Sequence, residues 1–217
     1  MSFGSGAMTN SIGEIKDCDV LFIIGSNPTE AHPVIGLEMK KALKKGAVFI
    51  VADPRKIWFA EHAKIHLQLK PGTDILLVSA MMNVIISEGL EDKEFIKNRT
   101  EGYEEIKELV KDITPEKVAC EVGVNADDIR NAARIYAATD KAGIFYTLGI
   151  TEHTCGTDNV RTLANLAMLT GHLGKPSAGV NPLRGQNNVQ GACDMGSDPG
   201  KYPGYQGVDD PASHAKF

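Results

Sequence analysis

Three loops of this sequence carry residue types that could bind a nucleotide, and each loop follows a predicted strand. Gly25-Ser26-Asn27-Pro28 combines a glycine that permits close backbone approach with hydroxyl and amide donors. Asp53 stands directly after the second predicted strand, where an acid commonly accepts hydrogen bonds from ribose hydroxyls. Asp74, after Pro71-Gly72, could accept two hydrogen bonds from the N1–H and the exocyclic amine of a guanine. Together these loops predict a nucleotide site.

The same motifs also have structural explanations. Asp53-Pro54 is a good turn sequence and Gly72-Thr73-Asp74 is good N-cap chemistry, and either one alone favours the structural explanation by roughly two to one. Their convergence shifts the balance, because ligands of open parallel sheets bind beyond the carboxyl ends of the strands. No Gly-x-Gly-x-x-Gly motif follows the first predicted strand, so an ordinary NAD-binding domain is poorly supported, and the absence of a P-loop motif excludes the P-loop NTPases.

Four β-to-α steps are predicted to position these loops. Residues 19–25 and 47–52 are continuous apolar runs, which is typical of strands buried on both faces of a parallel sheet. Further strands are predicted at 65–69 and 142–149, and helices at 34–45, 57–63, 74–88 and 159–170. Residues 92–139 are charged and helical, with Thr114 and Asn125 as N-cap positions. The predicted fold is α/β: a three-layer αβα, doubly wound, mostly parallel sheet (Rossmann-like) with a helical insertion and an irregular C-terminal tail.

The composition of the sequence changes after Gly171. Residues 172–205 are dense in Gly, Pro, Asn and Gln with little periodicity, and the last dozen residues are polar, so we expect no independent domain there. We assign residues 1–186 to a dinucleotide-binding-like αβα domain and residues 187–217 to the incomplete start of a next domain.

Composition and charge restrict the class of protein. The chain has 217 residues, of which 42% are hydrophobic and 24% charged, as in an ordinary globular domain. A formal charge of -5 with interleaved lysines argues against nucleic acid as a partner. No apolar run approaches the roughly 20 residues that span a bilayer, so we expect no membrane insertion and a cytoplasmic protein. The cysteines form no Cys-x-x-Cys pair and are predicted to be reduced, mostly buried thiols: Cys18, Cys120, Cys155 and Cys193.

The stretch from Gly174 to Gly191 packs amides, glycines and one arginine, Arg184, into an aperiodic segment that a core does not need. Such a segment can line a polar ligand with backbone and amide groups. A merely solvated loop usually shows Ser, Lys and Glu instead.

At this stretch the sequence resembles the formate dehydrogenase branch of the molybdopterin oxidoreductase family, and the likeness runs along the whole chain. It is carried by these motifs: Gly25-Ser26-Asn27-Pro28, Ala52-Asp53-Pro54-Arg55-Lys56, Lys70-Pro71-Gly72-Thr73-Asp74, Asn98-Arg99-Thr100-Glu101-Gly102, Leu166-Ala167-Met168-Leu169-Thr170-Gly171, Arg184-Gly185-Gln186-Asn187-Asn188-Val189-Gln190-Gly191-Ala192-Cys193-Asp194-Met195-Gly196 and Tyr202-Pro203-Gly204-Tyr205. The first three motifs are shared broadly in the superfamily, whereas the stretch that begins at Arg184 is specific.

The resemblance implies a bis(molybdopterin guanine dinucleotide) cofactor with molybdenum or tungsten. It assigns the following residues to the cofactor: Gly25, Ser26, Asn27, Glu30, Asp53, Arg55, Lys70, Gly72, Asp74, Gly149, Thr151, Glu152 and Gln186. It places Arg184 beside the metal as the catalytic residue that holds the substrate. Formate is a planar carboxylate, which a guanidinium binds bidentately while staying charged at any working pH.

The resemblance also implies parts that this chain does not contain. The metal-ligating cysteine or selenocysteine and a 4Fe-4S cluster are expected upstream, so no metal ligand is assigned here, and Cys155 with His153 is rejected as a substitute. The implied activity is oxidation of formate to CO2 or its reverse, with an iron–sulfur electron-transfer subunit as partner. We expect the isolated chain to be inactive and to retain no cofactor. Two alternatives stay open: a non-catalytic scaffold subunit of a redox complex and a formylmethanofuran-dehydrogenase-like enzyme.

Overall fold

The chain folds into two compact units, Met1–Leu183 and Arg184–Phe217. The computed structural model describes residue 3 and residues 7–217. The domain boundary expected after residue 186 remains a prediction.

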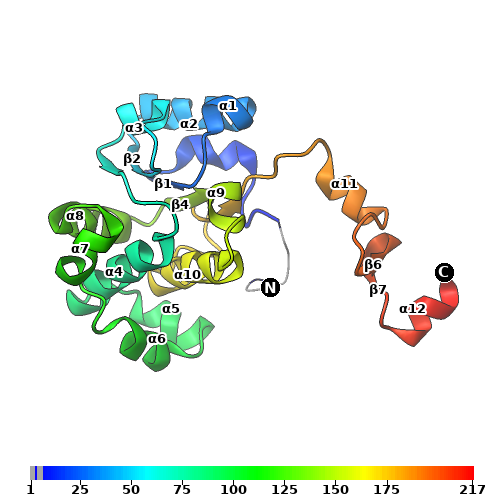
Figure 1. The fold of residues 1–217 in the computed structure, drawn as a ribbon. Helices are drawn as coiled ribbons and strands as arrows, with labels where there is room; N and C mark the ends of the chain where they lie inside the picture. Colours follow the sequence, from blue (N-terminus) through cyan, green and yellow to red (C-terminus); the bar gives the residue numbers. More distant parts are fainter. Residues whose placement is uncertain (1–2, 4–6) are drawn as a thin grey trace. The chain divides into compact units, whose positions relative to one another are not determined.

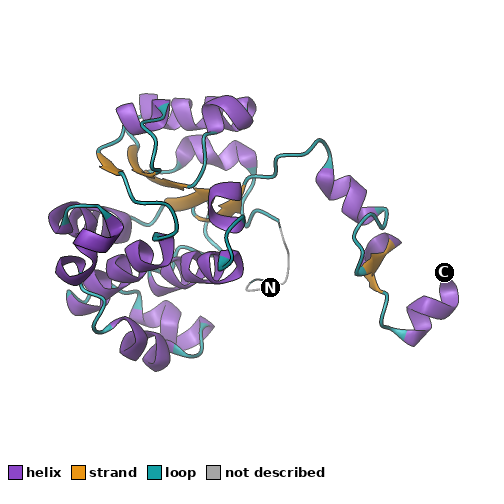
Figure 2. Ribbon diagram, in the orientation of Figure 1, coloured by secondary structure: helices purple, strands orange, loops and turns teal. Residues whose placement is uncertain are grey.

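The first unit contains a five-stranded parallel sheet, which confirms the predicted α/β fold (Figures 1 and 2). Its strands lie in the order β3-β2-β1-β4-β5. Their bounds are β1 (Val20–Ile24), β2 (Val48–Ala52), β3 (Ile65–Leu67), β4 (Ala142–Tyr146) and β5 (Gly179–Pro182). The order reverses between β1 and β4, so the crevice where ligands bind in doubly wound sheets is expected above these two strands.

Alternating side chains of β1 explain its unbroken apolar sequence. Val20, Phe22 and Ile24 belong to one buried cluster, and Leu21 and Ile23 belong to a second. Side chains of a strand alternate between the two faces of a sheet, and here both faces are covered by helices.

Figure 1 shows the two helical layers. One face carries η1 (Ile12–Asp17), α2 (Pro33–Lys44) and α3 (Trp58–Glu61). The other carries α4 (Asp74–Ser87), α7 (Pro115–Val122), α8 (Ala126–Ala137) and α10 (Gly156–Leu169), and the helical excursion adds α5 (Lys93–Arg99) and α6 (Tyr103–Val110). The two predicted N-caps are confirmed, because the side chains of Thr114 and Asn125 accept hydrogen bonds from the first turns of α7 and α8.

Two polar residues near the amino ends of the strands, His172 and Glu14, are bonded within the protein. His172 is 1% exposed, and its two ring nitrogens lie 2.8 Å from Thr170 Oγ1 and 2.6 Å from the carbonyl oxygen of Thr139. Glu14 accepts hydrogen bonds from the Ser177 N–H and the Asn10 amide. These contacts join the loops before β4 and β5 to neighbouring segments.

Three local predictions were wrong. The loop predicted before residue 34 contains a one-turn helix, α1 (Pro28–Ala31), because Pro28 has the φ angle that a first helical turn needs. The fourth strand ends at Tyr146 and not at residue 149, since α9 (Leu148–Thr151) begins there. The stretch after Gly171 contains β5, which pairs with β4 and is buried through tertiary contacts that a period-based reading does not detect.

The cysteine prediction was also partly wrong. All four thiols are free, but only Cys18 is buried, while Cys120 is exposed and Cys155 and Cys193 are half-buried. Cysteine composition alone does not tell which face of a helix a thiol occupies.

The second unit is built from α11 (Val189–Asp194), β6 (Lys201–Tyr202), η2 (Pro203–Tyr205), β7 (Gln206–Gly207) and α12 (Pro211–Lys216). Apart from Ser213, its residues are half-buried or exposed. Tyr202 stacks on Phe217 with ring centroids 5.0 Å apart, and its hydroxyl lies 2.9 Å from Nδ1 of His214. Among the helices that the structure describes in either unit, none is long and apolar enough to cross a membrane.

Candidate functional site

A cavity of about 440 Å³ opens at the carboxyl ends of the strands, at the place where the strand order reverses. Its lining residues come from the loops that follow β1, β2, β3 and β4: Gly25, Ser26, Asn27, Glu30, Ala31, Ala52, Asp53, Pro54, Arg55, Leu69, Pro71, Asp74, Thr147, Leu148, Gly149 and His153. We call this cavity the rim pocket. Its volume lies within the range of small-molecule sites, about 300–1,000 Å³.

Two glycines form the floor of the rim pocket. A Cβ atom on Gly25 would lie 2.7 Å from the carbonyl carbon of Gly149, and Gly25 has a φ of +54° that disfavours other residues. The Gly149 N–H and the Thr147 hydroxyl both donate to the Gly25 carbonyl oxygen, at 3.2 and 2.8 Å. The loops after β1 and β4 therefore touch through their backbones, which leaves the space above them open.

The loop after β1 presents hydrogen-bond donors. Ser26 is 3% exposed, and its Oγ has no hydrogen-bond partner within the described part of the chain. The side-chain carbonyl of Asn27 accepts a hydrogen bond from the Thr29 hydroxyl at 2.6 Å, which leaves the amide NH2 to donate elsewhere. A buried hydroxyl without a partner is costly, and a ligand oxygen in the rim pocket would remove that cost.

The loop after β2 presents a buried carboxylate. Asp53 is 3% exposed, and its Oδ1 accepts hydrogen bonds from the backbone N–H and Nε of Arg55, at 2.8 and 3.5 Å. No donor from the described residues reaches Oδ2. One carboxylate oxygen is thus fixed by the turn, and the other remains available to a ligand in the pocket that Asp53 lines.

The second carboxylate, Asp74, begins α4. Burial raises the pKa of Asp74 above its ordinary value of 3.8, and the nearby His153 ring opposes this effect. His153 Nε2 lies 4.0 Å from Asp74 Oδ2 and donates to the Gly149 carbonyl oxygen at 2.8 Å. A ligand with N–H groups facing Asp74 would stabilise its charged form.

Sequence reasoning did not assign Thr147 or His153 to the site. Both became visible only with α9, because this helix starts directly after Thr147 and brings the ring of His153 back onto Gly149, four residues earlier. The polar residues after the fourth strand were visible in the sequence, but the predicted end of that strand was wrong.

Of the residues predicted for the cofactor, eight line the rim pocket: Gly25, Ser26, Asn27, Glu30, Asp53, Arg55, Asp74 and Gly149. Lys70, Gly72, Thr151 and Glu152 do not line it, and Lys70 Nζ donates to the Cys120 carbonyl oxygen at 2.9 Å. Arg184 and Gln186 belong to the second unit, where Arg184 is half-buried and Gln186 is exposed. The roles of all these residues remain predictions.

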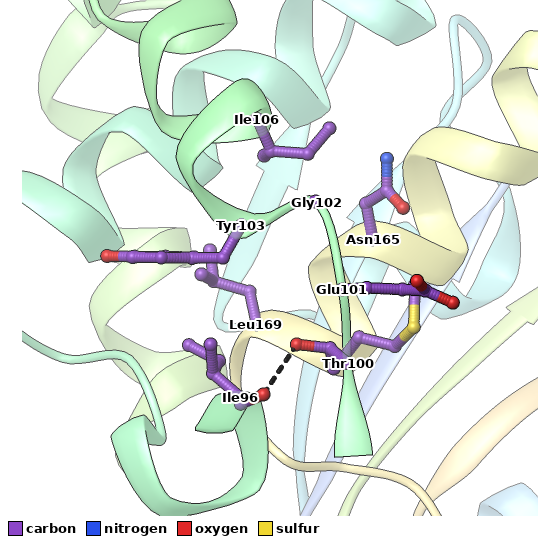
Figure 3. A pocket seen from close by; sticks show the side chains of 9 residues that line it. Ile96, Thr100, Glu101, Gly102, Tyr103, Ile106, Asn165 and Leu169 are labelled. Atoms are coloured by element: carbon purple, nitrogen blue, oxygen red, sulfur yellow. Dashed lines mark hydrogen bonds between the residues drawn. The ribbon is translucent and has the colours of Figure 1, made fainter. Parts of the chain in front are cut away.

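A second cavity lies between α5, α6 and α10 (Figure 3). It is lined mainly by apolar side chains, among them Ile96, Ile106 and Leu169, and the Thr100 hydroxyl donates to the Ile96 carbonyl oxygen at 2.8 Å. With a volume of about 40 Å³ it holds no more than a few waters. The rim pocket is the candidate site because its lining combines a buried hydroxyl without a partner among the described residues with two buried carboxylates.

Comparison with known proteins defines the class to which this fold and pocket belong. The family model for molybdopterin oxidoreductases matches residues 2–216, and the chain is a member of that family. Membership implies a molybdopterin cofactor.

Two individual relatives show how similar the chain is to formate dehydrogenases. The chain is 53% identical over 216 residues to the F420-dependent formate dehydrogenase 1 subunit alpha of Methanococcus maripaludis, covering 100% of this chain and 32% of that protein. It is 52% identical over 216 residues to formate dehydrogenase H of Escherichia coli, covering 100% of this chain and 30% of that protein. The chain thus spans about a third of the length of these relatives.

A solved structure shares the fold. Acetylene hydratase from Pelobacter acetylenicus superimposes with a TM-score of 0.71 and 32% identity, over 78% of this chain and 25% of that one. Since a hydratase and formate dehydrogenases share this architecture, the fold alone does not define the reaction.

Proposed function

We propose that this chain is the part of a formate dehydrogenase catalytic subunit that holds the guanosine diphosphate end of a molybdopterin guanine dinucleotide. The observation that carries the proposal is the rim pocket, which combines two buried carboxylates with a buried hydroxyl that has no partner in the described part of the chain. This set offers donors for phosphate oxygens and acceptors for ribose hydroxyls and guanine N–H groups.

The residues present fit such a cofactor. Ser26 and the Asn27 amide would donate to the diphosphate, Asp53 Oδ2 would accept from the ribose, and Asp74 would accept from the guanine edge. Gly25 and Gly149 leave the floor free of side chains, so that a ligand backbone can approach closely. Lys70, Gly72, Thr151, Glu152 and Gln186 would contact more distant parts of the same cofactor.

In the parent enzyme the bound metal–pterin group, with molybdenum or tungsten, would supply the site that accepts two electrons from formate. Arg184 would bind the formate carboxylate through two parallel N–H···O bonds and offset its negative charge. A lysine at this position would keep the charge and lose the paired geometry. Electrons would leave through iron–sulfur clusters to an electron-transfer partner, and CO2 and one proton would be released, in a cytoplasmic enzyme.

The identities favour formate dehydrogenase over the two alternatives. Formate dehydrogenases are about half identical to this chain along its whole length. A scaffold subunit without a working centre would have no use for a substrate-binding arginine, and the chain retains Arg184.

The test uses the parent holoenzyme and measures formate-dependent reduction of a viologen dye together with metal and guanine content. Arg184→Lys is expected to lose more than about 99% of the activity, in line with about 3 kcal/mol for a charged hydrogen-bonded pair, with unchanged cofactor content. Asp53→Asn, by contrast, is expected to lower the guanine content. Failure of the wild-type holoenzyme to oxidise formate would overturn the proposed activity. Formate-dependent dye reduction by the isolated chain would overturn the expectation that this chain is inactive by itself.

A further inference from the structure

His66 of the edge strand β3 and Gln68, one residue past the end of that strand, reach the turn that carries Asp53. His66 Nε2 lies 2.9 Å from the carbonyl oxygen of Asp53, and Gln68 Nε2 lies 2.9 Å from the carbonyl oxygen of Pro54. Both must donate, because a carbonyl oxygen only accepts. His66 and Gln68 thus act on two consecutive carbonyls, those of Asp53 and Pro54.

These bonds stand where the backbone ladder ends. The last paired residues of β2 and β3 are Ala52 and Leu67, and beyond them Pro54, Arg55 and Lys56 are exposed. Side-chain donors therefore hold the two segments together beyond the last backbone pairing between β2 and β3. Proline at position 54 has no N–H of its own, so its carbonyl oxygen is the backbone group by which the turn can be held there.

The orientation of the Asp53 carboxylate depends on this turn. Its Oδ1 accepts from the Arg55 N–H at 2.8 Å, within the same turn, and this bond decides which way Oδ2 points. A shift of the Asp53 and Pro54 carbonyls would move the Arg55 N–H and the carboxylate together.

We propose that His66 and Gln68 are positioning residues for the rim pocket, which hold the Asp53-Pro54-Arg55 turn so that Asp53 Oδ2 faces the ligand. The proposal rests on the nucleotide site proposed above. Neither residue lines the rim pocket, so their effect on a ligand passes through Asp53.

The experiment is a calorimetric titration of the full 217-residue chain with GDP at millimolar concentration. Gln68→Glu is nearly isosteric but replaces the donor by an acceptor facing a carbonyl oxygen, and is expected to weaken GDP binding about fivefold. His66→Ala is expected to weaken it by a similar factor, and His66→Gln, which restores an N–H donor, to recover most of the loss. The matched control is His62→Ala, because His62 Nδ1 lies 2.9 Å from the Trp58 carbonyl oxygen and does not hold the turn.

A double-mutant cycle distinguishes a positioning role of Gln68 from a general loss of structure. In an Asp53→Asn background, which itself binds GDP weakly, Gln68→Glu is expected to cause less than a twofold further change. Hydrogen exchange at the Arg55 amide gives a readout without ligand and is expected to accelerate in Gln68→Glu and His66→Ala. Thermal denaturation checks that each variant is folded, and since Gln68 is exposed, Gln68→Glu is expected to fold normally.

The outcomes distinguish the two proposals. If the wild-type chain and Asp53→Asn bind GDP equally or not at all, the nucleotide site is wrong and the positioning role falls with it. If Asp53→Asn weakens binding while Gln68→Glu and His66→Ala bind as the wild type does, the nucleotide site stands and the positioning role is wrong. Equal losses in both backgrounds would also overturn the positioning role.

Discussion

His172 and Ser26 are buried polar residues at opposite ends of the parallel sheet, and they differ in their hydrogen bonding. At the amino ends of the strands, His172 is buried with both ring nitrogens bonded to protein atoms, and Glu14 accepts hydrogen bonds from three residues. At the carboxyl ends, Ser26 is buried to a similar degree, yet its hydroxyl is without a partner among the residues that the structure describes. The cost of burying a polar group is thus met within the protein at His172 and left for a ligand at Ser26.

This contrast predicts how substitutions should behave. Removal of a polar group at the amino end should lower stability and leave nucleotide binding intact. Removal of a polar group at the carboxyl end should weaken binding and leave stability unchanged or raised. Three variants test this division, and a fourth, Gly25→Ala, tests the close contact between the loops after β1 and β4.

Gly25→Ala is expected to have the largest effect, because it affects both properties. Its Cβ would collide with Gly149 backbone atoms at 2.7 Å, and the φ of +54° adds backbone strain, so we expect a loss of about 3 kcal/mol in the free energy of unfolding. GDP binding should disappear with it. The control is Gly89→Ala, which has a comparable φ of +67° and no atom within 4 Å of the added Cβ. Equal urea midpoints for the two variants would contradict the close-contact explanation.

His172→Ala should lower the free energy of unfolding by about 2–3 kcal/mol at pH 8, since it creates a cavity and removes the donor to the Thr139 carbonyl oxygen. Its GDP affinity should equal that of the wild type. If His172→Ala also loses GDP affinity, the two ends of the sheet are not independent.

The burial of His172 also predicts that the stability of the wild-type chain depends on pH. Burial lowers the pKa of His172 below its ordinary value of 6.5, and the charge of Lys175 lowers it further. The hydrogen bond to the Thr139 carbonyl and the charges of Asp140 and Asp92 act in the opposite direction. Protonation therefore favours the unfolded chain, and wild-type stability should be complete at pH 8 and fall as the pH drops below about 6.5. Urea unfolding of His172→Ala between pH 8 and pH 5 should lack this part of the decline.

Ser26→Ala should change the two properties in opposite directions. Loss of a buried, unpartnered hydroxyl should leave the free energy of unfolding unchanged or raise it by up to about 1 kcal/mol, while GDP binding weakens about fivefold. The matched variant is Thr170→Val, which removes a buried hydroxyl that is bonded within the protein and should cost about 1 kcal/mol without affecting binding. Destabilisation by Ser26→Ala equal to that of Thr170→Val would remove the contrast between the two ends.

Glu14→Gln should have the smallest effect, about 1 kcal/mol or less at pH 7, because the group is only partly buried and screened by solvent. Hydrogen bonds from Asn10, Ser177 and Ser11 lower the pKa of Glu14 from 4.5 to about 2. Its contribution is therefore present above pH 4.5 and is lost as the pH falls towards 2. Chemical unfolding of both proteins should show a difference at pH 7 that vanishes near pH 2, and a constant difference would exclude this origin.

The sequence was informative where local patterns decide structure. Continuous apolar runs predicted β1 and β2, and Thr114 and Asn125 marked helix starts, since strands buried on two faces and N-caps leave signatures in neighbouring residues. The convergence of Ser26, Asp53 and Asp74 on one pocket also followed, because parallel strands end at the same edge.

What could not be predicted depends on contacts between distant segments. The strand β5 is short and carries Asn181 and Pro182, so only its pairing with β4 makes it a strand. The place of His153 depends on α9, a single turn that propensity does not specify. The attachment of the Asp53 turn by His66 and Gln68 likewise joins side chains to main-chain carbonyls, which leave no signal in residue type.

The contact between the loops after β1 and β4 also constrains the order in which the protein can form. Thr147 and Gly25 are 122 residues apart, and α4 to α8 lie between them in the chain. During synthesis, β1 and β2 leave the ribosome long before their neighbour β4 exists, so the apolar edge of β1 stays open until the helical excursion has been translated. The floor of the rim pocket therefore closes late, after most of its walls have been made.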